Sequence, residues 1–381
     1  MKKILILGAT GSIGRQTLEI IDANPLDFKL IGVSGFNNTS LLIEIIRKYE
    51  LSIASVKDSI QAEKIKKINP NIKILIGEQG LIDFAGFNPE EDITLINALV
   101  GMVGLKPTLR AIGINRNVLL ANKETLVVGG HLIKEALKKS SSNLYPIDSE
   151  HSAIWQLLNG ENKSSVKRLI ITASGGSFRD KARTELEDVS LESALNHPNW
   201  SMGSKITIDS ATMINKGFEI IEAVYLFDLG IDKVEAILHQ ESLIHSFVEF
   251  EDGSITAQIA EHDMRLPIHY AMYYPERKES IANKLDFMKL NNLHFEKIDF
   301  NRYPCLFYAI EAYKIGGSMR TVLNAANEIA VRLFIEKKIK FLDIERIIKE
   351  EMEHHQVITF PSLEEIYTID SEIKTRIYNQ Y

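Results

Sequence analysis

Short apolar runs rich in β-branched residues alternate with stretches of helical spacing along the first 147 residues of the chain. The runs predict strands, and the stretches between them predict the helices that connect those strands. This alternation is typical of an α/β domain with a parallel sheet. The predicted strands are Ile4–Leu7, Lys29–Val33, Ile53–Val56, Lys73–Ile76, Thr94–Ala98, Asn117–Leu120 and Leu144–Ile147.

The pattern changes in residues 148–277, where fewer helical stretches separate the apolar runs. This change predicts a second, central domain of the α+β class. Residues 278–304 have no strong periodicity, and we expect them to form a linker. The predicted strands of the central domain are Val166–Thr172, Val234–Leu238, His245–Phe250 and Ser254–Ile259.

Residues 305–381 predict a C-terminal α-helical bundle, because their apolar residues recur at helical spacing. Ser362 and Glu365 form a capping-box pattern after Pro361, which predicts the start of the last helix. The apolar faces of the last two predicted helices are Ile344, Ile347, Ile348 and Met352, and Ile366, Ile369, Ile373 and Ile377.

The composition is that of an ordinary globular protein, with 381 residues, 45% hydrophobic and 25% charged. The formal charge of −7 includes no basic arm, so we expect neither nucleic acid nor an anionic membrane as a partner. Cys305 is the only cysteine, which excludes an intramolecular disulfide and favours the reducing cytoplasm. The N-terminal apolar run Ile4–Leu7 is too short for a signal peptide or a membrane span.

A glycine-rich turn follows the first predicted strand and precedes a predicted helix. Its three glycines, Gly8, Gly11 and Gly14, have the spacing of a variant dinucleotide-binding turn. Such a turn lets the backbone approach a pyrophosphate, whose charge the free N–H groups of the helix start then bind. The alternative is a tight turn whose glycines serve packing alone. The turn therefore favours a Rossmann-like domain in residues 1–147.

The end of the second predicted strand bears on the choice of cofactor. Residues 34–39, Ser-Gly-Phe-Asn-Asn-Thr, contain no acidic residue of the kind that binds the ribose of NAD. A 2′-phosphate would meet hydroxyl and amide donors there and no repelling carboxylate. This loop favours NADPH.

Two carboxylates, Asp148 and Glu150, follow the last predicted strand of the first domain. If the strand continued through them, its alternation would place both on one side, where they could bind a hard cation. The alternative is the N-terminus of a helix, where serine and acidic residues cap free N–H groups.

A third carboxylate, Glu219, lies in a stretch predicted to be helical from Met213 to Glu222. Asn215 is four residues before Glu219 and Lys216 is three residues before it, so the three share one helical face. This face could bind a metal through Glu219 and a phosphate through the other two. The alternative is an exposed Lys–Glu pair without a function.

Two further segments carry candidate chemistry. Ser174-Gly175-Gly176 follows a predicted strand and resembles a phosphate-binding nest, although a plain loop has the same composition. The segment from His197 to Gly203 combines a proline, a tryptophan and a glycine next to a histidine. It could form a loop that closes over a site, or a turn around a core tryptophan.

Together these segments resemble the 1-deoxy-D-xylulose 5-phosphate reductoisomerase family along nearly the whole chain. The resemblance rests on an ordered set of motifs and not on any single one. The motifs are Gly-Ala-Thr-Gly-Ser-Ile-Gly at 8–14, Ala-Asn-Lys-Glu at 121–124, Asp-Ser-Glu-His at 148–151, Ser-Gly-Gly at 174–176, His-Pro-Asn-Trp-Ser-Met-Gly at 197–203, Asp-Ser-Ala-Thr-Met at 209–213 and Asn-Lys-Gly at 215–217 with Glu219.

The resemblance implies an enzyme that rearranges a ketose phosphate and reduces the product with NADPH, using Mg²⁺ or Mn²⁺. It implies metal ligands at Asp148, Glu150 and Glu219, and a catalytic role for Lys123 beside these carboxylates. The implied substrate contacts are Lys123, Ser149, Glu150, Ser174, His197, Trp200, Met202, Ser210, Asn215, Lys216 and Glu219. The implied cofactor contacts are Thr10, Gly11, Ser12, Ile13, Gly35, Phe36, Asn37, Asn122, Glu124 and Gly203.

Further expectations come from the same resemblance. Trp200 and Met202 would belong to a flexible lid, the central domain would hold the metal and the substrate, and the enzyme would be a homodimer. Phe36 is a departure, because many relatives have a basic residue in that loop, and Arg15 is our candidate substitute.

Two other functions share part of this pattern. A different NADP-dependent dehydrogenase, such as one acting on a semialdehyde, would have the nucleotide turn but would need no set of three carboxylates. A non-catalytic dinucleotide sensor that signals through its helical domain would have no use for metal ligands. Both alternatives therefore conflict with residues 148–219.

Overall fold

The computed structural model describes residues 1–200 and 202–381, and the chain divides into two compact units. The first unit consists of Met1–Leu126, Gly130–Ser152 and Asp263–Ala282. The second unit consists of Val127–Gly129, Ala153–His262 and Asn283–Tyr381. The units do not follow the predicted domain boundaries residue by residue, and the division into functional domains stays a prediction.

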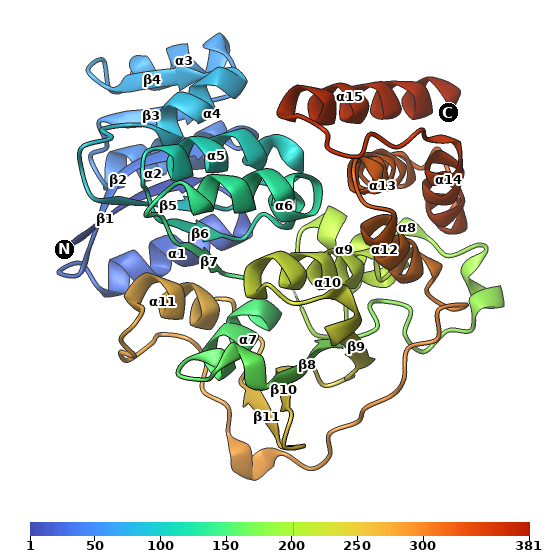
Figure 1. The fold of residues 1–381 in the computed structure, drawn as a ribbon. Helices are drawn as coiled ribbons and strands as arrows, with labels where there is room; N and C mark the ends of the chain where they lie inside the picture. The colour runs from blue at the N-terminus through green and yellow to red at the C-terminus, as the bar shows by residue number, and fades with distance from the viewer. Residues whose placement is uncertain (201) are drawn as a thin grey trace. The chain divides into compact units, whose positions relative to one another are not determined.

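The first unit is built on a parallel sheet of seven strands in the order β4-β3-β2-β1-β5-β6-β7 (Figure 1). These strands confirm the α/β fold predicted from the alternating pattern, with ends that differ by at most two residues. Their bounds are β1 (Lys2–Leu7), β2 (Phe28–Gly35), β3 (Ile53–Val56), β4 (Lys73–Ile76), β5 (Ile93–Asn97), β6 (Val118–Leu120) and β7 (Leu144–Pro146).

Helices connect the successive strands, as parallel pairing requires. They are α1 (Ser12–Ala23), α2 (Thr39–Lys48), α3 (Ser59–Lys66), α4 (Gly77–Ala85), the 3₁₀ turn η1 (Met102–Gly104), α5 (Leu105–Gly113) and α6 (Lys123–Lys138). A later segment, α11 (Arg265–Tyr273), packs against α1 and β7. The Tyr273 ring lies 4.8 Å from the Phe28 ring, centroid to centroid, and its hydroxyl donates to Asp27 Oδ2 at 2.6 Å.

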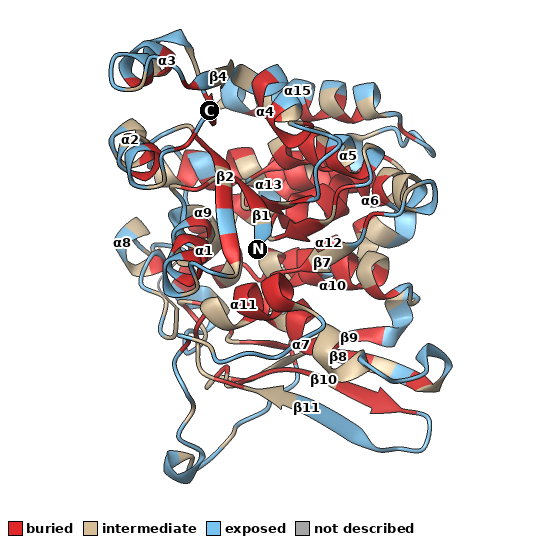
Figure 2. Ribbon diagram, turned by 90° about the vertical axis from the view of Figure 1, so that its left-hand side faces the viewer, coloured by how far each residue is buried: buried red, intermediate tan, exposed pale blue. Residues whose placement is uncertain are grey.

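The order of strands reverses at β1, because β2 leads to one edge of the sheet and β5 leads to the other. In open parallel sheets, ligands bind beyond the carboxyl ends of the strands at such a switch point. Ile4, Leu5, Ile6 and Leu7 are almost completely buried, so β1 is a rigid support for the turn that follows it (Figure 2).

The second unit contains a sheet of four strands in the order β11-β10-β8-β9, as predicted for an α+β domain. Its strands are β8 (Val166–Ala173), β9 (Val234–Leu238), β10 (Ile244–Phe250) and β11 (Ile255–Ile259). Strands β8 and β9 are parallel, and β10 is antiparallel to both of its neighbours. Helix α10 (Ile214–Phe227) contacts β8 and β9 and shares a core with them that includes Ile171, Ile220 and Val234.

The helical bundle predicted at the C-terminus is confirmed. Its helices are α12 (Pro304–Ile315), α13 (Met319–Ile335), α14 (Phe341–His354) and α15 (Leu363–Gln380). Helices α14 and α15 pack on α13, and the predicted isoleucine faces of both are buried. The capping box of Ser362 and Glu365 is present at the start of α15.

Shorter elements complete the second unit. They are α8 (Leu191–Ala194), α9 (Ser204–Ala211) and the 3₁₀ turns η2 (Lys163–Ser165), η3 (Arg183–Leu186), η4 (Ile231–Lys233) and η5 (Phe287–Lys289). Helix α7 (Ser149–Leu158) begins among residues of the first unit and continues into the second. Before α12 begins at Pro304, the predicted linker contains the turn η5 and Glu296, which forms an antiparallel bridge with Leu238 of β9.

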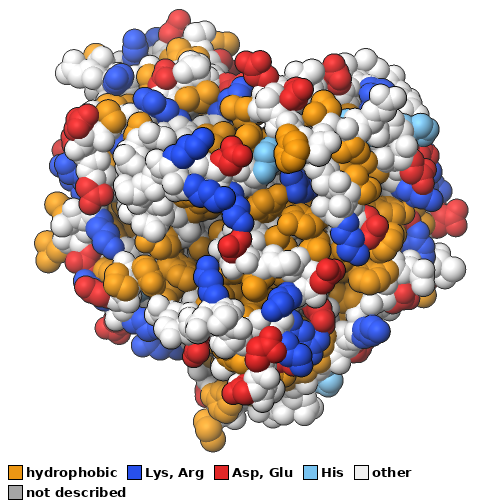
Figure 3. Space-filling view, in the orientation of Figure 1, with side chains coloured by type: hydrophobic (Ala, Val, Ile, Leu, Met, Phe, Trp, Pro, Cys, Tyr) orange, Lys and Arg blue, Asp and Glu red, His pale blue; other side chains and the backbone are white. Residues whose placement is uncertain are grey.

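Within the described part of the chain, no helix has the length and apolarity needed to cross a membrane. On the face drawn in Figure 3, acidic and basic side chains are interspersed among apolar and uncharged ones.

Candidate active site

Most of the predicted cofactor contacts lie at the carboxyl ends of three strands of the first unit. These are Thr10, Gly11, Ser12 and Ile13 after β1, Gly35, Phe36 and Asn37 at the end of β2, and Asn122 and Glu124 after β6. Since β1 and β2 are neighbours, the first two groups lie side by side. A Cβ atom on Gly35 would lie 3.1 Å from the Thr10 side chain, which shows how closely the two turns approach.

The three glycines of the first turn have different roles. A Cβ atom on Gly8 would lie 2.5 Å from the Ala98 carbonyl oxygen, and one on Gly14 would lie 2.4 Å from the Gly8 carbonyl oxygen. Both positions therefore require glycine for packing. Gly11 is exposed and precedes α1 without a side-chain cap, and a Cβ there would contact only Gly8 O, at 3.3 Å. Internal packing restricts Gly11 less than the other two glycines, and its place before the free N–H groups of α1 is the one that the predicted phosphate contact requires.

Asn122 and Glu124 bind the backbone of the loop after β5. The Asn122 amide donates to the carbonyl oxygens of Leu99 and Gly101 at 3.1 and 2.9 Å. Glu124 Oε1 accepts the Gly101 N–H at 3.1 Å, and Glu124 Oε2 accepts from Asn122 at 2.9 Å. Through these bonds, both residues position a loop at the carboxyl edge of the sheet.

The strand predicted to carry Asp148 and Glu150 is a helix start instead. Strand β7 ends at Pro146, Asp148 precedes α7, and Glu150 lies in its first turn, so the alternation argument was wrong. Carboxylates are stabilised at this position by the N–H groups and the dipole of the helix. Carboxylate oxygens of Asp148 and Glu150 nevertheless lie within 4.8 Å of each other, so the metal site stays a prediction that this proximity allows.

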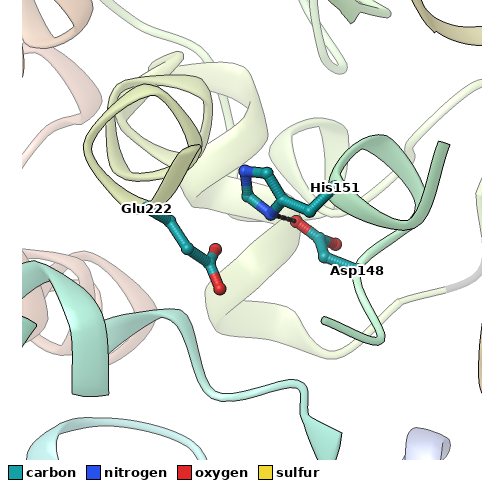
Figure 4. Close-up of side chains that lie close together, drawn as sticks. All are labelled: Asp148, His151 and Glu222. Carbon is teal, nitrogen blue, oxygen red and sulfur yellow. Dashed lines mark ion pairs between the residues drawn. The ribbon is translucent and has the colours of Figure 1, made fainter. Parts of the chain in front are cut away.

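Neighbouring donors hold these two carboxylates. The Lys123 ammonium forms a short ion pair with Asp148 Oδ2, and both side chains are largely buried. His151 Nδ1 lies 3.5 Å from the same oxygen, in the ion pair drawn in Figure 4, which also shows Glu222 of α10. The Ser149 hydroxyl donates to Glu150 Oε2 at 2.6 Å. Lys123 and Ser149 are both predicted substrate contacts.

The second unit repeats this arrangement on α10, where the predicted helical face is confirmed. Asn215 Nδ2 donates to Glu219 Oε1 at 2.6 Å, and the Lys216 ammonium pairs with Glu219 Oε2. The Glu219 side chain is 1% exposed, so this is a buried ion pair and not the exposed pair of the alternative interpretation. Met213, just before α10, has a φ of 63°, a left-handed conformation that is rare for a side chain of this type.

The Ser174 loop lies against the end of α9. Gly175 and Gly176 both have positive φ angles, and a Cβ on Gly176 would lie 2.6 Å from the Ser210 carbonyl oxygen. The loop that follows Ser174 therefore lies directly against the backbone of Ser210. The Gly176 N–H donates to Ser174 Oγ at 3.2 Å, so the serine hydroxyl closes the turn on itself.

Hydrogen bonds assign the tautomer of His197. Its Nδ1 accepts the backbone N–H groups of Asn199 and Trp200 at 3.1 and 3.0 Å, so the proton of the neutral ring is on Nε2. Nε2 lies 3.0 Å from Ser174 Oγ. Because that oxygen accepts from both His197 and Gly176, its own hydroxyl proton is directed away from them.

Burial, together with the smaller effect of the charges of Arg179 and His262, lowers the pKa of His197 from 6.5 to about 4. The imidazole is therefore neutral at neutral pH. Since its pKa in the unfolded chain is higher, this histidine contributes stability above pH 6.5 that is lost as the pH falls toward 4.

Sequence reasoning missed the residues that anchor the predicted lid. Asn199 Nδ2 donates to the Gln240 carbonyl at 2.6 Å and to Ser242 Oγ at 3.0 Å, and Arg179 donates to the same carbonyl at 2.9 Å. The Trp200 ring packs edge-on against His262, 5.2 Å between centroids. These bonds run to residues far along the chain and leave no local pattern.

A predicted lid residue, Met202, and a predicted cofactor contact, Gly203, end this segment. Met202 is partly buried and Gly203 is exposed at the start of α9, whereas Ser201 of the motif lies outside the described residues. Gly203, predicted as a cofactor contact, belongs to the second unit, unlike the other predicted cofactor contacts.

A dinucleotide-binding parallel sheet and a set of carboxylates accompanied by ammonium, amide and hydroxyl donors define a class, that of the nucleotide-dependent oxidoreductases. The donor set fits a hard divalent cation, because Mg²⁺ and Mn²⁺ prefer carboxylate oxygens.

Models of one family match nearly the whole chain. The family model described as 1-deoxy-D-xylulose 5-phosphate reductoisomerase matches residues 4–130. The model of its C-terminal domain matches residues 144–227, and a DXP reductoisomerase C-terminal domain matches residues 259–376.

Individual relatives agree with these models. The chain is 50% identical over 381 residues to the 1-deoxy-D-xylulose 5-phosphate reductoisomerase of Bacillus cereus (strain Q1), covering 100% of both chains. It is 51% identical over 376 residues to that of Geobacillus sp. (strain WCH70), covering 98% of both. The chain therefore belongs to the 1-deoxy-D-xylulose 5-phosphate reductoisomerase family.

Solved structures of this family are similar in fold. A DOX-P reductoisomerase in complex with NADPH, fosmidomycin and magnesium has a TM-score of 0.94 at 37% identity, covering 100% of this chain and 98% of that one. The enzyme from Zymomonas mobilis in complex with NADPH has a TM-score of 0.90 at 40% identity, covering 98% and 97%.

We predict that the His197 ring stays neutral, with its proton on Nε2, down to about pH 5, because its pKa is about 4. Nitrogen chemical shifts of the labelled histidines, followed from pH 8 to pH 4, would show both the tautomer and the midpoint. The signal is assigned with the variant His197→Gln. A midpoint near 6.5 or a proton on Nδ1 would contradict the assignment.

Proposed function

We propose that this chain converts 1-deoxy-D-xylulose 5-phosphate to 2-C-methyl-D-erythritol 4-phosphate with NADPH and Mg²⁺ or Mn²⁺, a step of non-mevalonate isoprenoid precursor biosynthesis. The observation that carries this proposal is the 50% identity to named reductoisomerases along the full length of the chain. The similar solved structures contain NADPH and magnesium, the cofactors proposed here.

The proposed metal ligands are Asp148, Glu150 and Glu219. When bound, the cation polarises the carbonyl and orients the neighbouring oxygen for the rearrangement, and NADPH supplies the hydride. The proposed cofactor contacts are Thr10, Gly11, Ser12, Ile13, Gly35, Phe36, Asn37, Asn122, Glu124 and Gly203. The proposed substrate contacts are Lys123, Ser149, Glu150, Ser174, His197, Trp200, Met202, Ser210, Asn215, Lys216 and Glu219.

The donors of the second unit suit the substrate phosphate. Ser174 turns its hydroxyl proton outward because His197 and Gly176 donate to its oxygen. Lys216 and Asn215 add an ammonium and an amide, and they turn to the phosphate once Glu219 takes up its role as a metal ligand. Charge-assisted bonds of this kind are among the strongest that a protein makes with phosphate.

Lys123 is proposed as the catalytic cation. Its ammonium is largely buried and lies against Asp148, so it can donate to an oxyanion that develops next to the metal ligands. His197 stays neutral and acts as a donor that orients Ser174.

The two other candidate functions are disfavoured by the same residues. A dehydrogenase without a metal, or a dinucleotide sensor, has no use for a buried Glu219 held by Lys216 and Asn215. Burying such a carboxylate costs free energy of folding. A role in binding or catalysis explains why the chain retains it.

We propose a division of labour along the chain and a place in the cell. Residues 1–147 bind NADPH, 148–277 bind metal and substrate, 278–304 link the domains, and 305–381 form the supporting helical domain. A cytoplasmic location agrees with a single, buried cysteine.

We propose a homodimer, because β11 is an edge strand whose first residues are exposed (Figure 2). An open edge is a template for pairing with a second chain.

The proposed reaction predicts that purified protein oxidises NADPH in the presence of 1-deoxy-D-xylulose 5-phosphate and Mg²⁺ or Mn²⁺, and that a chelator stops the oxidation. The absorbance of NADPH measures this directly, with NADH in a parallel assay. NADPH binding without oxidation would contradict the proposed reaction and would favour a different dehydrogenase or a dinucleotide sensor.

We predict that Glu219→Gln folds and binds NADPH but loses turnover by at least about 100-fold, the range seen when a catalytic electrostatic group is removed. Thermal unfolding and NADPH fluorescence establish folding and cofactor binding, and the absorbance assay measures turnover. Glu328→Gln is a matched control, because Glu328 is a carboxylate that pairs with Lys374 within the helical bundle. Normal turnover of Glu219→Gln would remove Glu219 from the metal site.

We predict that Ile255→Lys shifts the protein from dimer to monomer in analytical ultracentrifugation, because a charge on an edge strand opposes pairing. Ile255 is 54% exposed, and the matched control Ile60→Lys changes an isoleucine on α3 that is 64% exposed. A wild-type monomer, or a dimer that both variants leave intact, would contradict pairing through β11.

A further inference from the structure

The loop after β2 lacks a cation for the 2′-phosphate that distinguishes NADPH from NADH, since Phe36 stands where a basic residue would serve. We propose that Lys57, at the end of the neighbouring strand, binds this phosphate and determines the preference for NADPH. The proposal rests on the proposed function only in taking NADPH as the cofactor.

The register of the sheet brings Lys57 to the required edge. Gly35, the last residue of β2, is paired with Val56, the last residue of β3. Phe36 and Lys57 are therefore the first residues beyond two adjacent parallel strands, at their carboxyl ends. Doubly wound sheets bind the adenine ribose at the end of the second strand, so a residue at this place is within reach of the ribose phosphate.

A side chain ties the two loops together. Gln61 Oε1 accepts the backbone N–H of Lys57 at 3.0 Å, and Gln61 Nε2 donates to the carbonyl oxygen of Phe36. Gln61 thus satisfies one backbone group in each loop and fixes the spacing between them. Lys57 is thereby positioned relative to the loop that would receive the ribose.

The charge of Lys57 is available for a ligand. Its side chain is exposed and forms no ion pair with any residue that the structure describes. The adjacent Asp58 is already engaged, because its carboxylate accepts the Gln61 N–H at 3.0 Å as the cap of α3. No carboxylate follows β2 in residues 34–39 to oppose an incoming phosphate.

Arg15 is the competing cation. It is also exposed, but it lies on α1, one residue after the buried Gly14, and within the described part of the chain its side chain has no hydrogen bond or ion pair to the loop after β2. Lys57 is connected to that loop by sheet register and by Gln61. The two residues therefore make different predictions when each is neutralised.

The experiment is a fluorescence titration of the full chain with NADPH and with NADH, supported by calorimetry with 2′,5′-ADP and 5′-AMP. Lys57→Gln should lower the affinity for NADPH and for 2′,5′-ADP by roughly 10- to 100-fold, which is the effect of losing one hydrogen bond to a charged group. NADH and 5′-AMP should bind as before. Lys57→Arg should restore most of the NADPH preference because it restores the charge.

Two further variants serve as controls. Lys66→Gln removes a positive charge from the other end of α3 and should change neither cofactor. Arg15→Gln should lower the affinity for NADPH less than Lys57→Gln does.

Four outcomes would overturn the inference. If the affinity for NADPH falls selectively in Arg15→Gln but not in Lys57→Gln, Arg15 binds the 2′-phosphate. Equal weakening of NADPH and NADH in Lys57→Gln assigns Lys57 a structural role. A wild type that turns over substrate equally well with both cofactors removes the preference itself but leaves the proposed reaction intact, whereas a wild type that binds neither cofactor removes both.

Discussion

The buried ion pair between Lys216 and Glu219 is the interaction on which the proposed site depends. A carboxylate taken out of water without a partner costs several kcal/mol, roughly, and the chain must fold before any metal or substrate is bound. Lys216 and Asn215 meet this cost for Glu219 from within one helix. Helix α10 can therefore present an acid to a metal and still be stable without it.

The same solution recurs at the start of α7. Asp148 is held by Lys123 and Glu150 by Ser149, so each proposed metal ligand is held by a proposed substrate contact. If these carboxylates bound the proposed metal, the donors would become available to the substrate. The proposed site therefore predicts that metal and substrate binding are coupled, and by reciprocity each would strengthen the other.

The sequence predicts the strands well, because a run of β-branched residues bounded by polar ones has few alternative structures. It fails at Asp148-Ser149-Glu150, since three residues of alternating character fit both the end of a strand and the capped start of a helix. Helical spacing alone was enough to predict that Asn215, Lys216 and Glu219 share one face of a helix. The anchors of the lid, Asn199 and Arg179, were not, because their partner is a backbone carbonyl about 40 and 60 residues away.

In the proposed site the carboxylates leave their protein donors to bind the metal, and the donors then bind the substrate phosphate. Calorimetric titration of the metal-free protein with Mn²⁺, with and without saturating inorganic phosphate, tests this exchange most directly. We predict that phosphate tightens Mn²⁺ binding, that Mn²⁺ tightens phosphate binding by the same factor, and that Lys216→Met abolishes most of this coupling. Equal Mn²⁺ affinities with and without phosphate in the wild type would contradict the account.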